Sequence, residues 1–151
     1  MIALGVLAAV LVAAAGIGIL VRRNEGRVRD SAPAVVVPES GRSALLSEAG
    51  VIAGRPTVLH FSADWCGPCA AVRRVVAAAV AELSTAAAPP LDLEVDIDAN
   101  PALARELNVL SLPTTFLLDA TGQERFRIAG VPKAPDLRRS LAELAGSGRS
   151  E

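Results

Sequence analysis

The two cysteines of the chain, Cys66 and Cys69, are separated only by Gly67 and Pro68, and this pair constrains the fold more than any other feature. The run "TVLHFSA" over residues 57–63 precedes the pair, and a long segment rich in alanine and valine follows it. The β-branched and aromatic run predicts a strand, and the segment after Pro68 predicts a helix. We therefore expect the two thiols at the start of a helix that follows a strand.

The rest of the chain continues this alternation of strands and helices. Further strand-like runs cover residues 35–37, 91–98, 114–119 and 123–130, and helix-like runs cover 43–50, 101–107 and 135–145. Strands that alternate with helices and end in a hairpin and a closing helix are typical of a small α/β domain. The sequence predicts such a domain, with a mixed central sheet.

The N-terminal segment differs from the rest in composition. Residues 1–21 carry no charged side chain, and Arg22 and Arg23 follow them. A helix of that length would measure about 31 Å, close to the apolar thickness of a bilayer. We expect a transmembrane helix over residues 1–22 and not a cleaved signal, whose basic residues would precede the apolar run. The expected organisation is this helix, a juxtamembrane linker at 23–33, a domain at 34–147 and a tail at 148–151.

Charge indicates the orientation of that helix and excludes one class of partner. Arg22, Arg23, Arg27 and Arg29 all follow the apolar run, and positive residues beside a span tend to stay in the cytoplasm. A single-pass protein with a cytoplasmic domain is expected, and an extracytoplasmic domain is the alternative. The net charge of -1 argues against a nucleic-acid partner, which requires a basic face.

Two chemistries suit a Cys-x-x-Cys pair at a helix start. A helix N-terminus favours the thiolate, so Cys66 is expected to attack a disulfide and Cys69 to resolve the mixed disulfide. A structural zinc site normally requires four ligands, and apart from carboxylates the chain offers only Cys66, Cys69 and His60. We expect redox chemistry with no cofactor beyond the Cys66–Cys69 disulfide and no metal. A copper carrier with two thiolates is an alternative.

The residues around the pair narrow these possibilities. The motifs "DWCGPC", "DIDANP", "LSLPT", "DATGQ" and "AGVPKA" occur in this order over about residues 34–147. In order and spacing they resemble the thioredoxin family. The resemblance implies a three-layer thioredoxin-like domain and a disulfide oxidoreductase, with Gly67-Pro68 typical of reducing members. Its implied partners are disulfide-bearing proteins and an electron-donating reductase, and a non-catalytic binding module is a further alternative.

The same resemblance implies a substrate-binding surface around the cysteines. The bond before Pro113 is expected to be cis, the backbone of Leu112 to pair with an extended substrate segment, and Gly130 and Val131 to form an adjoining loop. Trp65 is expected to cover one side of the cysteines, and Gly67 and Pro68 belong to the same surface.

The chain departs from the family at several positions. His60 stands where the family has a buried aspartate, and Glu94 stands where many members have a lysine. His60 is therefore expected to accept the proton of Cys69, with Glu94 orienting the ring; a strand histidine without a catalytic role is the alternative. Arg74 replaces a proline that kinks the active-site helix, so a straighter helix is expected. Arg73 is expected on a solvated face.

Overall fold

The computed structural model describes residues 2–24, 26–30, 39–86 and 88–147 of the chain. Helices and strands alternate through most of these ranges, as the sequence predicts. The elements are α1 (Ile2–Asn24), β1 (Val28–Asp30), α2 (Glu39–Glu48), β2 (Thr57–Ser62), α3 (Cys69–Glu82), β3 (Leu91–Asp96), α4 (Pro101–Glu106), β4 (Thr114–Leu118), β5 (Glu124–Ala129) and α5 (Ala134–Ser147).

The strands form one mixed sheet in the order β1-β5-β4-β2-β3. β2 and β3 are parallel, and the other neighbouring strands are antiparallel. Every residue of β2 and β4 is buried, whereas burial along the edge strand β3 varies from residue to residue. Strands covered on both faces are mostly apolar, which explains why the "TVLHFSA" run lies in the centre. The predicted mixed sheet is confirmed.

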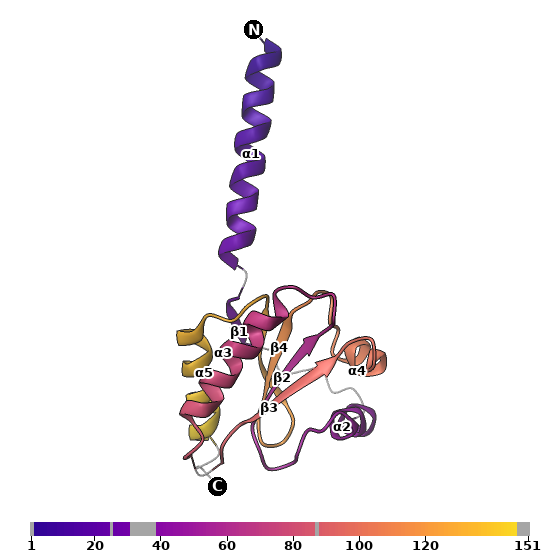
Figure 1. Ribbon diagram of the computed structural model, residues 1–151. Coiled ribbons are helices and arrows are strands. Elements are labelled where there is room, and N and C mark those ends of the chain that lie inside the picture. Colours follow the sequence, from indigo (N-terminus) through magenta and orange to yellow (C-terminus); the bar gives the residue numbers. More distant parts are fainter. Residues whose placement is uncertain (1, 25, 31–38, 87, 148–151) are drawn as a thin grey trace.

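Helices cover both faces of this sheet, so the domain has the predicted three layers (Figure 1). On one face, Val58 of β2 packs with α3 and α5, and on the other, Phe61 packs with α2 and α4. The ring of Phe61 meets that of Phe116 edge-on, with centroids 5.9 Å apart. Because side chains of a strand alternate between its faces, His60 lies on the same face as Val58, under α3.

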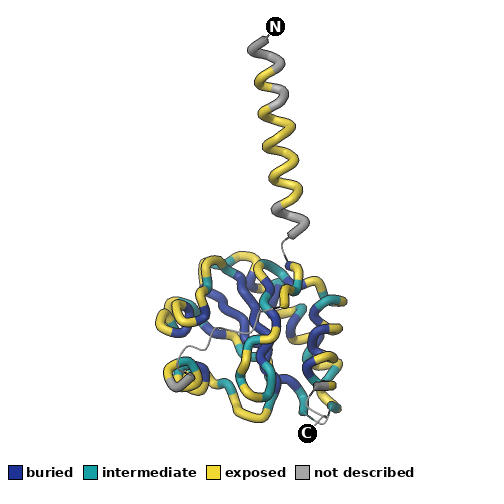
Figure 2. Tube along the Cα trace, turned by 180° about the vertical axis from the view of Figure 1, so that it is seen from behind, coloured by how far each residue is buried: buried dark blue, intermediate teal, exposed yellow. Residues whose placement is uncertain are grey.

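The helix expected over residues 1–22 is present as α1, and it extends away from the domain (Figure 1). Side chains 6, 7 and 10–20 of α1 are all exposed (Figure 2). Within the part of the chain that the structure describes, none of the helices meets the length and hydropathy of a membrane span. The helical part of the prediction is thus confirmed, and the membrane-spanning part is not.

The domain begins with a strand that the sequence pattern does not predict. β1 lies within residues 23–33, the expected linker, and pairs with β5 so that Val28 is opposite Ile128. A strand of three residues with a single apolar side chain shows no alternation, which explains why the pattern misses it. The strand expected at 35–37 and the tail at 148–151 lie outside the described residues.

Candidate active site

A disulfide joins Cys66 and Cys69 at the N-terminus of α3. Pro68 is the N-cap residue and Cys69 begins the helix, so the pair has the predicted position. Cys69 is only 1% exposed, whereas Cys66 is half-buried. In the reduced state, the unpaired amides at this end of α3 favour a thiolate on Cys66, the sulfur that a large substrate can reach.

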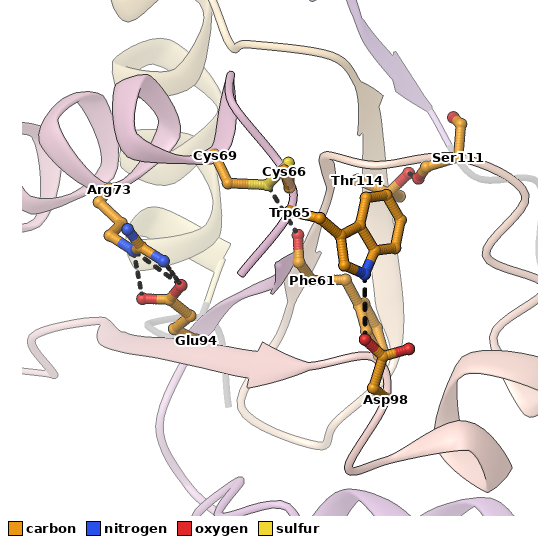
Figure 3. The surroundings of a disulfide bond; sticks show 9 residues. All are labelled: Phe61, Trp65, Cys66, Cys69, Arg73, Glu94, Asp98, Ser111 and Thr114. Carbon is orange, nitrogen blue, oxygen red and sulfur yellow. Dashed lines mark hydrogen bonds and ion pairs between the residues drawn. A yellow bond between two sulfur atoms is a disulfide. The ribbon is translucent and has the colours of Figure 1, made fainter. Parts of the chain in front are cut away.

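The side chain of Trp65 lies beside the disulfide and is 70% exposed (Figure 3). Its indole Nε1 donates a hydrogen bond to Oδ2 of Asp98, at 3.1 Å. The loop of Asp98 is itself ordered, because the backbone amide of Asp98 donates to Oδ1 of Asp96. An exposed apolar ring is therefore held in one place next to Cys66, where it is free to contact another protein.

Pro113 and the loop at Gly130 and Val131 adjoin each other, as expected. The Leu112–Pro113 bond is cis, and the amide of Gly130 donates to the carbonyl of Pro113 at 2.8 Å. Pro113 is buried, whereas Leu112, Gly130 and Val131 are partly exposed. The structure thus brings the implied docking residues to one edge of the domain.

His60 does not pair with Glu94, and this corrects the sequence-based expectation. The imidazole is 2% exposed, and its Nε2 lies 3.1 Å from Oδ1 of Asp92 on β3. His60 and Glu94 are register partners in the parallel pair β2–β3, so the expected neighbourhood is correct. The partner is nevertheless Asp92, two residues earlier on the same face of β3, because another side chain binds the Glu94 carboxylate.

That side chain is Arg73 of α3, which is exposed, as expected, and also binds this carboxylate. Its Nε donates to both carboxylate oxygens of Glu94, at 2.7 and 2.8 Å, and its Nη2 lies 2.7 Å from Oε1 (Figure 3). Hydrogen bonding and charge from Arg73 hold the pKa of the Glu94 carboxyl below its ordinary value. The same bond raises the pKa of Arg73. The pair therefore joins α3 to the sheet one helical turn beyond Cys69.

Sequence reasoning missed Asp92, Arg73 and Asp98 as parts of this site. Asp92 carries a faint signal, since the alternation of "LDLEVDID" places it on the same face as Glu94. Arg73 carries none, because the approach of α3 to β3 depends on tertiary packing. Among the residues that the structure describes, no three His, Cys, Asp or Glu side chains are grouped as metal ligands.

Comparison with known proteins agrees with this geometry. A family model described as Thioredoxin matches residues 47–143. The chain is 34% identical over 117 residues to a thioredoxin of Mycolicibacterium smegmatis, covering 76% of this chain and 96% of the relative. It is 35% identical over 91 residues to a bifunctional thioredoxin reductase/thioredoxin of Mycobacterium leprae, covering 60% of this chain and 19% of that protein. A solved Fasciola hepatica thioredoxin superposes with a TM-score of 0.53 at 27% identity, covering 70% of this chain and 93% of that structure.

Proposed function

Since the chain belongs to the thioredoxin family and is a thiol–disulfide oxidoreductase, we propose that it reduces disulfide bonds of protein substrates through Cys66 and Cys69. The observation that carries this proposal is the unequal exposure of the two sulfurs at one helix N-terminus. A half-buried Cys66 is reachable by a protein disulfide, whereas Cys69, at 1% exposure, is reachable only from within the molecule.

The proposed reaction transfers two electrons in two exchanges. The Cys66 thiolate attacks one sulfur of the substrate disulfide, a mixed disulfide forms, and the second substrate sulfur leaves as a thiolate that takes up a proton. Cys69 then attacks Cys66, the Cys66–Cys69 bond forms, and the first substrate sulfur is released. Oxidation of the two enzyme thiols therefore balances reduction of the substrate.

Substrate binding is assigned to the edge that surrounds Cys66. Leu112 offers backbone groups beside the buried Pro113, and the loop at Gly130 and Val131 is hydrogen-bonded to that proline. An extended segment with free backbone groups could add along such an edge, as in other cases of strand addition. Trp65, Gly67 and Pro68 are exposed on the other side of the disulfide and complete the surface.

The dithiol requires a reductase that returns two electrons after each turnover. A relative in Mycobacterium leprae is named a bifunctional thioredoxin reductase/thioredoxin. By analogy, we assign the electron supply of this chain to a thioredoxin reductase.

A reduction assay with insulin tests the enzymatic proposal. The full chain, with dithiothreitol as the electron donor, should accelerate insulin reduction, and Cys66→Ser should abolish the acceleration. After dithiothreitol is removed, pre-reduced Cys69→Ser should instead accumulate a mixed disulfide with insulin, since Cys66 can still attack. Equal turnover by Cys66→Ser would refute the proposal. Binding of insulin without turnover would favour a docking module, and stoichiometric copper binding without turnover would favour a metal carrier.

Membrane attachment through residues 1–22 is a second part of the proposal. Residues 1–21 carry no charged side chain, and the described side chains of α1 are exposed along its length. Burial of such a helix in lipid would remove that apolar surface from water. The arginines after α1 favour a domain on the cytoplasmic side.

Membrane fractionation and thiol labelling test this attachment. The full chain should remain in membranes after alkaline carbonate washing. Leu11→Arg, which costs about 2.5–3.5 kcal/mol at the centre of a span, should reduce the membrane fraction. Leu110→Arg is the matched control, because Leu110 is an exposed leucine of the domain. Equal loss in both variants would contradict attachment by α1. Labelling of Lys133→Cys in a Cys66→Ser, Cys69→Ser chain from outside would contradict the cytoplasmic orientation.

A further inference from the structure

A row of polar side chains crosses the face of the sheet that α3 and α5 cover. His60 on β2 is the register partner of Thr115 on β4 and of Glu94 on β3. His60 is 2% exposed and Thr115 is fully buried, and the Thr115 hydroxyl has no hydrogen-bond partner among the described residues. Most of the neighbouring core is apolar, so a buried imidazole here requires a compensating partner.

Two contacts place His60 under the first turns of α3. The Sγ atom of Cys69 lies 3.9 Å from the carbonyl oxygen of Phe61, the residue that follows His60. Arg73, one turn after Cys69, binds Glu94, the register partner of His60 (Figure 3). His60 therefore lies in β2 next to the residue that Cys69 contacts, and opposite the residue of β3 that Arg73 binds.

The contact with Asp92 determines which nitrogen of the ring can accept a proton. An ionised carboxylate only accepts hydrogen bonds, so at 3.1 Å the Nε2 atom of His60 carries the hydrogen and donates it to Asp92. The lone pair is then on Nδ1, which is the basic nitrogen of this tautomer. The Asp92 side chain is 32% exposed, whereas the imidazole is almost completely buried. Asp92 therefore links the buried ring to solvent.

We propose that Asp92 is a positioning residue that fixes His60 as the proton acceptor for the Cys69 thiol and gives the proton a route to solvent. This inference rests on the proposed reductase function, because it concerns the second exchange. An orienting carboxylate has the same physical role in other sites where a histidine activates a nucleophile.

In the mixed disulfide, Cys66 is bonded to a substrate sulfur, and the Cys69 thiol gives its proton to Nδ1 of His60. The Cys69 thiolate attacks Cys66, the Cys66–Cys69 bond forms, and the bond to the substrate breaks. Its electron pair leaves with the substrate sulfur, which takes up a proton from water. The imidazolium then gives its Nε2 proton to solvent by way of Asp92, so one proton leaves the ring for the one that Nδ1 took up.

The other groups packed around His60 explain why Asp92, and not Glu94, has this role. Three charged side chains lie on this face of β3 and α3: Asp92, and the bidentate pair of Glu94 and Arg73. β4 contributes the Thr115 hydroxyl, and the side chains buried on α5 are Leu137, Ser140, Leu141 and Leu144. Among these groups Asp92 contacts the ring, and the charge of Glu94 is neutralised by Arg73.

Single-turnover kinetics of the mixed disulfide, from about pH 6 to about pH 9, test the inference. A cysteine with an ordinary pKa of about 8.5 is about 3% ionised at pH 7. Complete removal of the proton by a base would therefore raise the rate of attack by such a thiol by up to about 30-fold at this pH. Asp92→Asn should slow decay of the mixed disulfide by about 3- to 30-fold at pH 7, with the deficit vanishing at the alkaline end, where Cys69 ionises unaided. The first attack by Cys66 should keep its wild-type rate. Asp92→Glu, which keeps the carboxylate, should restore most of the rate.

Two further variants separate positioning from a structural effect. In a His60→Ala chain, adding Asp92→Asn should change nothing, because the two residues act as one unit. Glu94→Gln is the matched control on the same face of β3. It should leave the pH midpoint of decay unchanged or lower it, because the released Arg73 charge favours a thiolate.

The outcomes also separate this inference from the function on which it rests. If the wild-type chain does not reduce insulin, the proposed function fails. If the wild type reduces insulin and the mixed disulfide of Asp92→Asn decays with the wild-type pH profile, the positioning role fails and the reductase proposal stands. An equal shift of the midpoint in Asp92→Asn and Glu94→Gln would also overturn the role, because the effect would then not be specific to the carboxylate that contacts His60.

Discussion

Gly26 lies where the chain enters the domain, and replacing it with alanine should damage both stability and substrate docking. Its φ is +71°, and a Cβ atom built on it would collide with the backbone carbonyl of Val131 in the docking loop. The amide of Gly26 donates to the carbonyl of Ala129 at 2.7 Å, which prevents the backbone from moving aside freely. The substituted chain must therefore displace the loop at Val131.

Gly54 offers a control that isolates this collision. Its φ is +84°, but nothing lies within 4 Å of a Cβ atom built there. A left-handed backbone costs a residue with a side chain about 1–2 kcal/mol, and the stiffer unfolded chain returns about 0.4–1 kcal/mol. Gly54→Ala should thus lower the free energy of unfolding by about 0.5–1.5 kcal/mol. Gly26→Ala should lower the free energy of unfolding by about 1–3 kcal/mol more than Gly54→Ala does, which is the usual cost of forcing atoms into a packed site.

Guanidinium unfolding of the full chain in mild detergent, followed by circular dichroism, measures the two free energies. Insulin reduction supplies the second readout: KM should rise in Gly26→Ala, because the loop beside Pro113 moves. It should not rise in Gly54→Ala, whose amide bonds Ala120 at the other end of β4. Equal losses of stability in the two variants, or an unchanged KM in Gly26→Ala, would refute the argument.

Three further predictions follow from single contacts. Leu137→Ala should lower the free energy of unfolding by about 2–5 kcal/mol, because this fully buried side chain fills the layer between α3, α5 and the sheet; a loss within the scatter of surface mutants would contradict that packing. Arg73 lowers the pKa of Glu94, so the stability that Glu94→Gln removes should be present above about pH 4.5 and vanish as the pH falls through the lower folded pKa; a difference that persists in acid would refute this in a pH series of unfolding curves. Trp65→Ala should raise the KM for insulin by about tenfold, a contact worth about 1.4 kcal/mol, while reduction of a small disulfide keeps its rate; equal losses on both substrates would argue against docking.

The fold could be predicted from the sequence where a run of adjacent residues shows that a segment is buried or carries a known motif. The runs that became β2 and β4 are buried at every position, and the Cys66–Cys69 pair begins α3 as its motif indicates. β1 could not be predicted, because its place in the sheet depends on pairing with β5, a strand about a hundred residues away. Backbone hydrogen bonds hold such a strand in the sheet, and the amino-acid composition does not encode them.

From the sequence it could be predicted which residues of the site are neighbours, but not which of them bind each other. His60 and Glu94 are register neighbours, as the motif spacing implies, yet each binds a different side chain. In a sheet, residues two apart on one face compete for the same neighbour, and the choice depends on which carboxylate a third group takes. Here Arg73 takes Glu94 and leaves Asp92 for the imidazole. This choice of partners depends on how closely α3 packs on the sheet, which no sequence pattern specifies.

The point at which the chain enters the domain determines which edge of the domain the proposed tether would hold near a membrane. Gly26 is bonded to Ala129, and the following Gly130 is bonded to Pro113, so the segment leading from α1 meets the domain at its docking edge. β2, which Cys66 follows in the sequence, ends at this same end of the sheet (Figure 1), where its Phe61 pairs with Thr114. With α1 in a membrane, the dithiol would face the lipid surface and not point away from it. Substrates held at the membrane would then meet Cys66 at a high effective concentration. A bulky soluble substrate would have to enter the space between the domain and the lipid, so tethering favours disulfides that lie close to the membrane.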